Sequence, residues 1–401
     1  MEAVRRSYMI RGWLMLAWIP LAYAIGRGIG NSVFIIFFFY ALISLRRTDI
    51  GWKPLLGTLY LLFIAAFFLS VPGAVSVSDA LQGWLKVVLW SSSFFLVLIA
   101  LRQGECRWRR LATWFGVAAF LAGGNFLGEL ALFYWQGSGH VAGKVSGLVA
   151  AYMLPFALHL LLDRGKSAGS IIGAFLYSVV LLTGLLFANS STEVLIAGAG
   201  LVVYLSLVTG RGLLLILGML VAVVIVVGSE LYPKLSALEG KSLRQGMNLL
   251  SSHRTELWLG ALEHPPENQW IGVGLRNTAH YAVAKVIGVK SLHNFIIATW
   301  YETGLVGLTT LLAFLGYAGG RSGAWLISGA TTLHRQEAAP WVAGIVGVLI
   351  ANSLDGAAKT FSFSCVLFVC LAVLWHMRES AVGAQGEEGG SKVASRLAQR
   401  E

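Results

Sequence analysis

Hydrophobic residues occur along this chain in long continuous runs, and polar residues collect in the segments between them. A run of about 20 apolar residues is long enough for a helix to cross the hydrocarbon core of a bilayer. The runs predict about twelve spanning helices, at 12–26, 31–45, 54–72, 84–101, 110–135, 147–163, 169–187, 193–209, 213–229, 293–318, 339–355 and 361–377. The first two runs are short and also fit one helical hairpin. The pattern predicts an all-α polytopic membrane protein.

The composition supports this class and excludes an ordinary soluble protein of 401 residues. Hydrophobic residues make up 57% of the chain, charged residues only 12%, and the mean hydropathy is +0.73. A soluble domain carries about 25% charged residues. The 47 glycines are also compatible with spanning helices, which tolerate glycine better than soluble helices do.

One long polar segment divides the chain. We expect about nine N-terminal helices over 1–228, a loop over 229–292 that contains short helices, and about three C-terminal helices over 293–377. The tail, 378–401, contains the polar stretch GAQGEEGGSK, whose composition is typical of disorder.

The basic residues predict the orientation, because short cytoplasmic loops of membrane proteins are enriched in Lys and Arg. Placing the N-terminus in the cytoplasm puts the following cations on that side: Arg5, Arg6, Arg11, Arg46, Arg47, Lys53, Arg102, Arg107, Arg109, Arg110, Arg164, Lys166, Arg211, Arg321, Arg335, Arg378, Lys392, Arg396 and Arg400. The short loops on the other side then carry only Arg27, Lys86, Lys144 and Lys359. We therefore expect both termini in the cytoplasm, the long loop in the periplasm, and an inner-membrane location. Since topology explains the net charge of +11, we do not expect nucleic-acid binding.

The cysteines and the N-terminus do not suggest further chemistry. Cys106, Cys365 and Cys370 lie in or beside apolar runs without metal-ligand spacing, so we expect neither a metal site nor a disulfide. The first apolar run lacks a small-residue cleavage site, which argues against a signal peptide.

The long loop contains a predicted helix followed by a glycine turn. Ser251 or Ser252 is a suitable cap for a helix that starts near His253, and Pro265 with Pro266 ends it. Gly272 and Gly274 then form a turn, without the third glycine and preceding strand of a dinucleotide-binding fingerprint.

The loop also concentrates cations that suit an anionic substrate at the membrane surface. They are Lys234, Lys241, Arg244, Arg254, Arg276, Lys285 and Lys290. A planar guanidinium matches phosphate oxygens and stays charged, so we favour Arg254 and Arg276 as pyrophosphate-binding residues, with Arg244 third. Binding of lipid headgroups, or simple solvation of the loop, is the alternative for each arginine.

His293 marks the predicted start of a spanning helix. A neutral imidazole, whose ordinary pKa is about 6.5, is able to accept a proton from an attacking sugar hydroxyl. Asn294 would orient the substrate or the ring, and the alternative for the His-Asn pair is a helix cap. We interpret Glu302 first as an intramembrane polar group that requires a partner, and second as a catalytic carboxylate; nine residues from His293, it falls near the opposite helix face. His253 and His264 lack partners at metal spacing and are interpreted as structural, and His280 stays open.

Two segments resemble the superfamily of O-antigen ligases and bacterial polysaccharide polymerases. SSHRTELWLGALEHPPENQWIGVG is similar to its pattern of Arg, a following Trp, Pro and a closing Gly-x-Gly, and SLHNFIIATWYETGLVGL to its His-Asn before a Gly-x-x-Gly helix. The two segments cover roughly 40 residues, and the expected topology resembles the family's over most of the chain.

The resemblance implies a membrane glycosyltransferase of the GT-C type that takes a glycan from undecaprenyl pyrophosphate. A ligase passes O-antigen to a sugar hydroxyl of lipid A–core, completing lipopolysaccharide. His293 would be the essential base and Arg254 a pyrophosphate-binding residue, with no cofactor and no metal.

The chain departs from the family at FANSSTEVL, where many relatives carry Ser-Arg and this sequence has Ser190, Ser191, Thr192 and Glu193. Another cation, Arg276 or Arg244, would have to replace that arginine. Ser-x-Thr here and Arg-Thr-Glu later resemble the polymerases, so a polymerase is the alternative to a ligase. A transporter or flippase is a further alternative, although its usual midplane charges and repeated halves are missing from this sequence.

Overall fold

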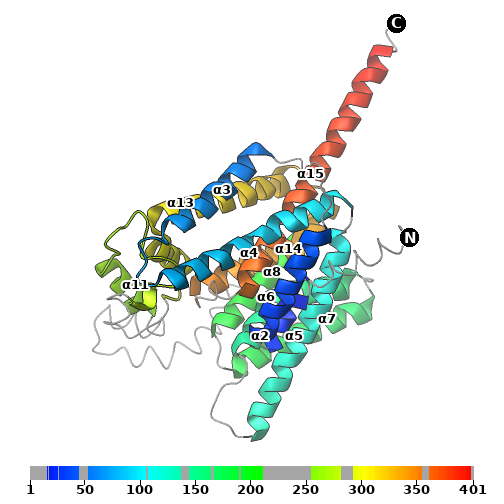
Figure 1. Ribbon diagram of the computed structural model, residues 1–401. Helices are drawn as coiled ribbons and strands as arrows, with labels where there is room; N and C mark the ends of the chain where they lie inside the picture. Colours follow the sequence, from blue (N-terminus) through cyan, green and yellow to red (C-terminus); the bar gives the residue numbers. More distant parts are fainter. Residues whose placement is uncertain are drawn as a thin grey trace, which may run out of the picture.

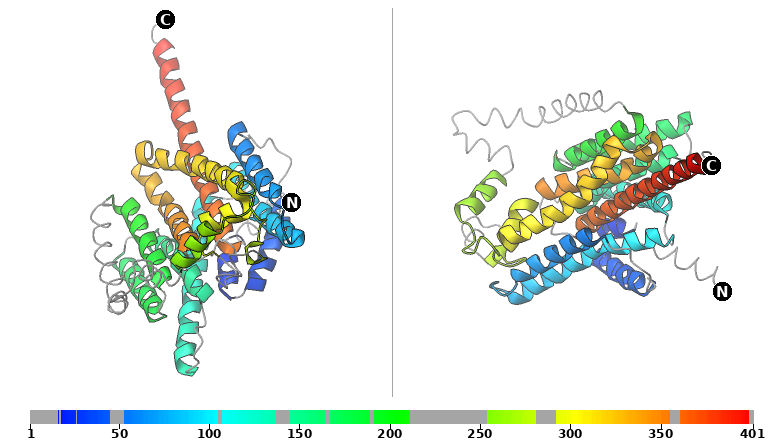
Figure 2. Two further views of the ribbon diagram at one scale, coloured as in Figure 1. Left: turned by 90° about the vertical axis from the view of Figure 1, so that its left-hand side faces the viewer. Right: turned by 90° about the horizontal axis from the view of Figure 1, so that it is seen from above.

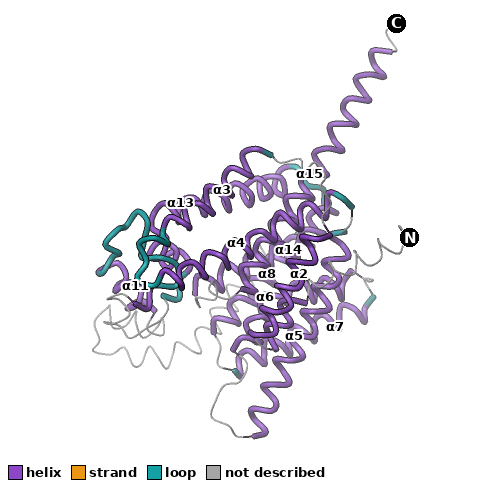
Figure 3. The backbone as a smooth tube through the Cα atoms, in the orientation of Figure 1, coloured by secondary structure: helices purple, strands orange, loops and turns teal. Residues whose placement is uncertain are grey.

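The computed structural model describes residues 16, 18–25, 27–44, 53–104, 107–136, 144–163, 167–188, 191–210, 254–280, 292–354 and 361–398. Within these ranges the chain forms helices joined by loops and contains no strand (Figure 3). The predicted span at 213–229 and most of the first half of the predicted loop lie outside the described residues.

The helices overlap the predicted apolar runs, although α4 and α14 begin seven residues earlier than predicted and α13 ends ten residues later. Before the long loop they are α2 (Arg27–Ser44), α3 (Pro54–Leu69), α4 (Val77–Arg102), α5 (Trp108–Gln136), α6 (Lys144–Asp163), α7 (Ala168–Phe187) and α8 (Ser191–Thr209). The rest are α11 (Arg254–Glu263), the short 3-10 helix η1 (Thr278–His280), α13 (Phe295–Ser328), α14 (Thr332–Leu354) and α15 (Phe361–Ala398).

The structure is that of a polytopic helical membrane protein. Among the described residues, seven helices are long and apolar enough to cross a bilayer, in α4, α5, α6, α7, α8, α13 and α15. Two shorter apolar stretches, Ile29–Ile43 and Pro54–Leu69, accompany them. Large apolar side chains on α7, such as Phe175 and Ile172, face outward, as expected of a helix surrounded by lipid.

The helices pack as a continuous series. α5 packs on α6, α6 on α8, α8 on α14, α14 on α15 and α15 on α4, while α3 lies along α13 (Figures 1 and 2). Aromatic rings fill the contacts: Trp341 of α14 meets Phe115 and Phe156, and Phe314 of α13 stacks on Phe63 of α3.

Two carboxylates join helix ends on the side away from the long loop. Glu379 of α15 accepts from Arg102 at 2.7 Å and pairs with Lys53 at 3.2 Å, and Glu337 of α14 pairs with Arg109. Lys53, Arg102 and Arg109 were all predicted for one membrane face, and the structure gathers them at one end of the helices.

The last helix extends further than predicted. α15 continues to Ala398, through residues whose composition is typical of disorder, and projects beyond the other helices (Figure 1).

Candidate functional site

The site is built around a break in α13. Gly304 has φ 69° and ψ −175°, a conformation that interrupts the helix and favours glycine. A helix break leaves backbone carbonyl and N–H groups without their usual partners on its two sides. Here the break lies inside the apolar body of the protein, where Glu302 and Thr303 are buried, so these groups need other partners.

The Gly-x-Gly segment of the long loop provides these partners. The N–H groups of Val273 and Gly274 donate to the carbonyls of Tyr301 and Glu302, at 3.1 and 2.9 Å. In the other direction, the N–H groups of Leu305 and Val306 donate to the carbonyls of Gln269 and Trp270, at 2.8 and 3.1 Å. The loop therefore completes the backbone hydrogen bonding of the broken helix.

Glycine is required where the two backbones meet. A Cβ atom on Gly304 would lie 2.1 Å from the carbonyl oxygen of Trp270, and one on Gly272 would lie 2.5 Å from the carbonyl carbon of Glu302. Gly272 and Gly274 also have positive φ angles, of 70° and 90°. The glycine turn predicted from the sequence thus serves as a close backbone contact.

Buried side chains fix the loop on two further sides. The amide of Asn277 accepts from the N–H of Ser76 at 2.7 Å and donates to the carbonyl of Ser76 at 3.1 Å, which ties the loop to the start of α4. The hydroxyl of Thr278 donates to Oε1 of Glu302 at 2.7 Å. The buried carboxylate of Glu302 therefore has a hydrogen-bond partner in the loop.

Asn294 caps α13, and His293 precedes the helix. Oδ1 of Asn294 accepts from the N–H of Ile297 at 3.0 Å, and its Nδ2 donates to the carbonyl of Ser353 on α14 at 3.3 Å. His293 has φ 48°, a left-handed conformation uncommon for a residue with a Cβ. Because His293 lies outside the helix, the prediction that it and Glu302 occupy opposite faces of one helix is wrong.

Arg254 lies at the start of α11, close to the predicted boundary at His253. Its Nη1 donates to Oγ1 of Thr192 on α8 at 3.3 Å. Thr192 belongs to the segment in which this chain departs from the Ser-Arg pattern of similar sequences. A guanidinium from the loop therefore reaches the start of α8.

The same helix contacts the segment that carries His293. Nε1 of Trp258 on α11 donates to the carbonyl of Leu292 at 3.0 Å, and the hydroxyl of Tyr301 donates to the carbonyl of His264 at 3.2 Å. The start of α13 is thus held between α11 on one side and α14 on the other.

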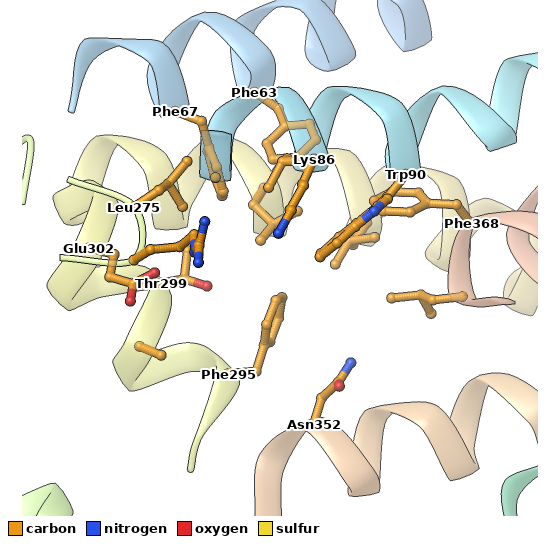
Figure 4. Close-up of a pocket in the computed structure, with 17 residues that line it drawn as sticks. Phe63, Phe67, Lys86, Trp90, Leu275, Phe295, Thr299, Glu302, Asn352 and Phe368 are labelled. Carbon is orange, nitrogen blue, oxygen red and sulfur yellow. The ribbon is translucent and has the colours of Figure 1, made fainter. Parts of the chain in front are cut away.

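A cavity of about 310 Å³ opens beside the first turns of α13. Its apolar wall includes Phe63 and Phe67 of α3, Trp90 of α4, Phe295 of α13 and Phe368 of α15 (Figure 4). Its polar lining consists of Lys86, Arg276, Thr299, Glu302 and Asn352.

Among the arginine candidates that the structure describes, Arg276 lines this cavity. It has φ 62°, and its Nη1 donates to Oε1 of Gln82 on α4 at 3.1 Å. Backbone conformations of this kind in non-glycine residues are concentrated at functional sites. Arg254, by contrast, contacts α8 and does not line the cavity.

Sequence reasoning missed Lys86 and Asn352. Lys86 was assigned to a short loop, but it lies within α4 and extends toward the cavity (Figure 4). A lone lysine in LQGWLKVVLW was a usable signal, because an ionisable residue inside a span often marks a functional site. No pattern in the sequence around Asn352 predicted that it would line a cavity shared with the long loop.

The remaining candidate residues do not line the cavity or lie outside the described residues. His280 lies on η1 with Nε2 3.5 Å from Oδ2 of Asp79. Arg244, His253 and both serines proposed as caps lie outside the described residues. Across the described ranges, no group of three His, Cys, Asp or Glu side chains is arranged to hold a metal ion.

A comparison with known protein families matches the part of the chain that contains the broken helix and the loop packed against it. Residues 176–312 match the family described as O-antigen ligase. This segment is similar to O-antigen ligases. It includes α8, α11, the glycine turn and the first half of α13, together with Arg254, Arg276, His293 and Glu302. Lys86 and Asn352 lie outside it. No curated protein matches the chain.

Proposed function

We propose that this protein transfers a glycan from undecaprenyl pyrophosphate to a sugar hydroxyl at the periplasmic face of the bacterial inner membrane. We further propose the ligase form of this reaction, in which O-antigen passes to lipid A–core. The observation that carries the proposal is the junction at 292–295. There Leu292, next to His293, accepts a hydrogen bond from Trp258 of α11, the helix that bears Arg254, and Phe295 lines the cavity that also contains Arg276.

The reaction needs a base at the acceptor. The acceptor hydroxyl oxygen forms a bond to the anomeric carbon of the donor glycan, the bond from that carbon to the pyrophosphate oxygen breaks, and the lipid pyrophosphate leaves. The hydroxyl proton passes to the imidazole of His293, which serves as general base. His293 precedes the helix and is only partly buried.

Cations stabilise the leaving group. Charge develops on the pyrophosphate as the glycosidic bond breaks, and a guanidinium placed there lowers the barrier. Arg254 is the first candidate, since its contact with Thr192 brings it to the helix end where similar sequences carry an arginine. Arg276 and Arg244 are additional pyrophosphate-binding candidates, and no metal or other cofactor is part of the proposal.

Asn294 and Glu302 are assigned positioning roles. Asn294 fixes the start of α13 directly after His293. Glu302 holds the loop through Thr278 and the backbone of Gly274, which sets the place of Arg276 two residues later in the chain. Neither role requires proton transfer to the substrate.

Direct attack by the acceptor inverts the anomeric centre. We expect the product linkage to have the configuration opposite to that of the donor. NMR coupling constants of the anomeric proton in donor and product measure this, and a retained configuration would replace direct attack with a two-step mechanism.

A polymerase remains the second candidate, favoured by one feature. Ser190-x-Thr192 and Arg254-Thr255-Glu256 resemble the polymerase pattern, and in this chain Thr192 and Arg254 contact each other. A polymerase would use the same base and cations, with a second lipid-linked repeat as acceptor.

The test is transfer by purified protein in proteoliposomes that contain undecaprenyl-pyrophosphate glycan. One set of vesicles also receives lipid A–core, and the other set receives only more donor. Glycan on lipid A–core supports the ligase, and longer chains on the undecaprenyl carrier support the polymerase. The absence of both products would contradict the proposed function.

A further inference from the structure

The cavity at the start of α13 contains two cations from different parts of the chain. Lys86 comes from α4, and Arg276 comes from the long loop. Arg276 donates to Gln82, which lies one helical turn before Lys86 on α4, so the two cations lie near each other. Like charges at short range repel each other, most strongly where protein and lipid exclude water. Within the part of the chain that the structure describes, Lys86 forms no ion pair, so an anion between the two groups would relieve this repulsion.

A buried amide faces the same cavity. Asn352 of α14 is 2% exposed, and its Oδ1 has no hydrogen-bond partner among the described residues. Figure 4 shows its side chain directed toward the cavity from the side opposite Lys86. A buried acceptor without a partner is costly, and a ligand hydroxyl would supply the missing donor.

The cavity wall favours an amphiphile. Phe63, Phe67, Trp90, Phe295 and Phe368 give it an aromatic lining within the helical body of the protein. A small inorganic anion would use the cations but would leave this lining without contacts. A ligand with an anionic head, an adjacent hydroxyl and one apolar chain would satisfy all three features.

We propose that Lys86 and Asn352 form a lipid-head subsite, in which Lys86 binds a phosphate oxygen and Asn352 accepts a hydrogen bond from a sugar hydroxyl of the same lipid. The occupant is an isoprenoid phosphate or pyrophosphate that carries a sugar, with its chain along the aromatic wall. This inference rests on the proposed function for the identity of the lipid. It adds two specificity-determining residues from outside the matched segment, 176–312.

Binding to purified protein in detergent tests the subsite. The probe is farnesyl pyrophosphate linked to N-acetylglucosamine, and its dissociation constant is measured by microscale thermophoresis. Lys86→Met keeps the length of the side chain but removes its charge, and we expect binding to weaken about tenfold. Lys86→Arg should restore most of the affinity.

The amide is tested with a matched pair of probes. Asn352→Leu removes the acceptor at nearly constant volume. We expect the dissociation constant of the glycosylated probe to rise about fivefold. The dissociation constant of farnesyl pyrophosphate without sugar should change by less than twofold. Equal losses for both probes would overturn the role of Asn352, because a purely structural effect does not distinguish them.

Two controls separate this subsite from general lipid binding. Lys53→Met removes a lysine at the far end of α3, and its affinity for the probe should equal that of the wild type. Dioleoyl phosphatidic acid should bind at least tenfold more weakly than the glycosylated probe. Equal affinity for both lipids, or equal affinity of Lys86→Met and wild type, would overturn the proposal. Binding that depends on Lys86 without any glycan transfer would instead leave the subsite standing and remove the proposed function.

Discussion

The hydroxyl of Thr278 donates a hydrogen bond to Oε1 of Glu302 across 2.7 Å, joining the long loop to the break in α13. Both residues are buried, at 1% and 5% exposure. Next to this contact, the backbone of the glycine turn pairs with the backbone on both sides of Gly304. A loop fixed in this way holds Arg276 at the cavity without its own regular secondary structure.

Replacing the hydroxyl of Thr278 should destabilise the protein. Thr278→Val keeps the shape of the side chain but leaves the Glu302 carboxylate without this donor, at a cost of about 1–3 kcal/mol of unfolding free energy. Thermal unfolding in detergent micelles measures the loss. Thr309→Val is the matched control, since Thr309 is exposed on α13 and its hydroxyl donates only to the backbone carbonyls of Leu305 and Val306, one turn earlier. Coincident melting of Thr278→Val and wild type would contradict the proposed anchoring role.

The break in α13 should tolerate no side chain. Gly304→Ala places a Cβ 2.1 Å from the carbonyl of Trp270 at a positive φ, so either the loop or the helix must move. We expect a large fall in the yield of folded protein on size-exclusion chromatography. Gly316→Ala, on the same helix with open space around its Cβ position, should fold like the wild type. Similar yields for both variants would argue against the close backbone contact.

Asn294 should act mainly through its side-chain oxygen. Asn294→Ala removes the cap of α13, a change that typically costs about 1 kcal/mol, and it also removes the contact with Ser353. Asn294→Asp keeps an acceptor for the N–H of Ile297 and should recover most of the thermal stability. If the aspartate variant melts as low as the alanine variant, the cap is not the source of the effect.

Arg254 should determine affinity for the donor. Arg254→Gln removes the positive charge near Thr192, and we expect the KM for the pyrophosphate donor to rise about tenfold or more, since hydrogen bonds to charged groups contribute about 1.5–3 kcal/mol. Arg254→Lys keeps the charge but not the planar fork, so its KM should be intermediate. Arg321→Gln, an exposed arginine further along α13, serves as control. A donor KM that is the same in Arg254→Gln and wild type would exclude this role.

The sequence was sufficient to predict the class of fold and several helix ends. Continuous apolar runs predicted the spanning helices. Pro265 and Pro266 predicted the end of α11, and Asn294 precedes the start of α13. These features depend on hydrophobicity and capping, which act between residues close together in the sequence. The break at Gly304 was not predicted, since a glycine in an apolar run is common in spanning helices. Only the loop backbone packed against it explains its conformation.

The composition of the site was predicted less completely than the fold. Arg276 and Glu302 were identified along the chain, and the structure brings both to one cavity. Lys86 and Asn352 reach the same cavity from α4 and α14, which lie hundreds of residues apart in the order of the chain. The sequence alone does not predict that these two residues line one cavity, because their proximity depends on how the helices pack.

The most direct test of the account is the single-turnover rate of glycan transfer by His293→Ala beside wild type, in proteoliposomes with saturating donor and acceptor. If His293 is the general base, the variant should lose about 10²–10⁴-fold in rate, the usual contribution of general base catalysis. Its thermal unfolding should show a folded protein. A folded His293→Ala variant that transfers glycan at a rate close to that of the wild type would contradict the central claim.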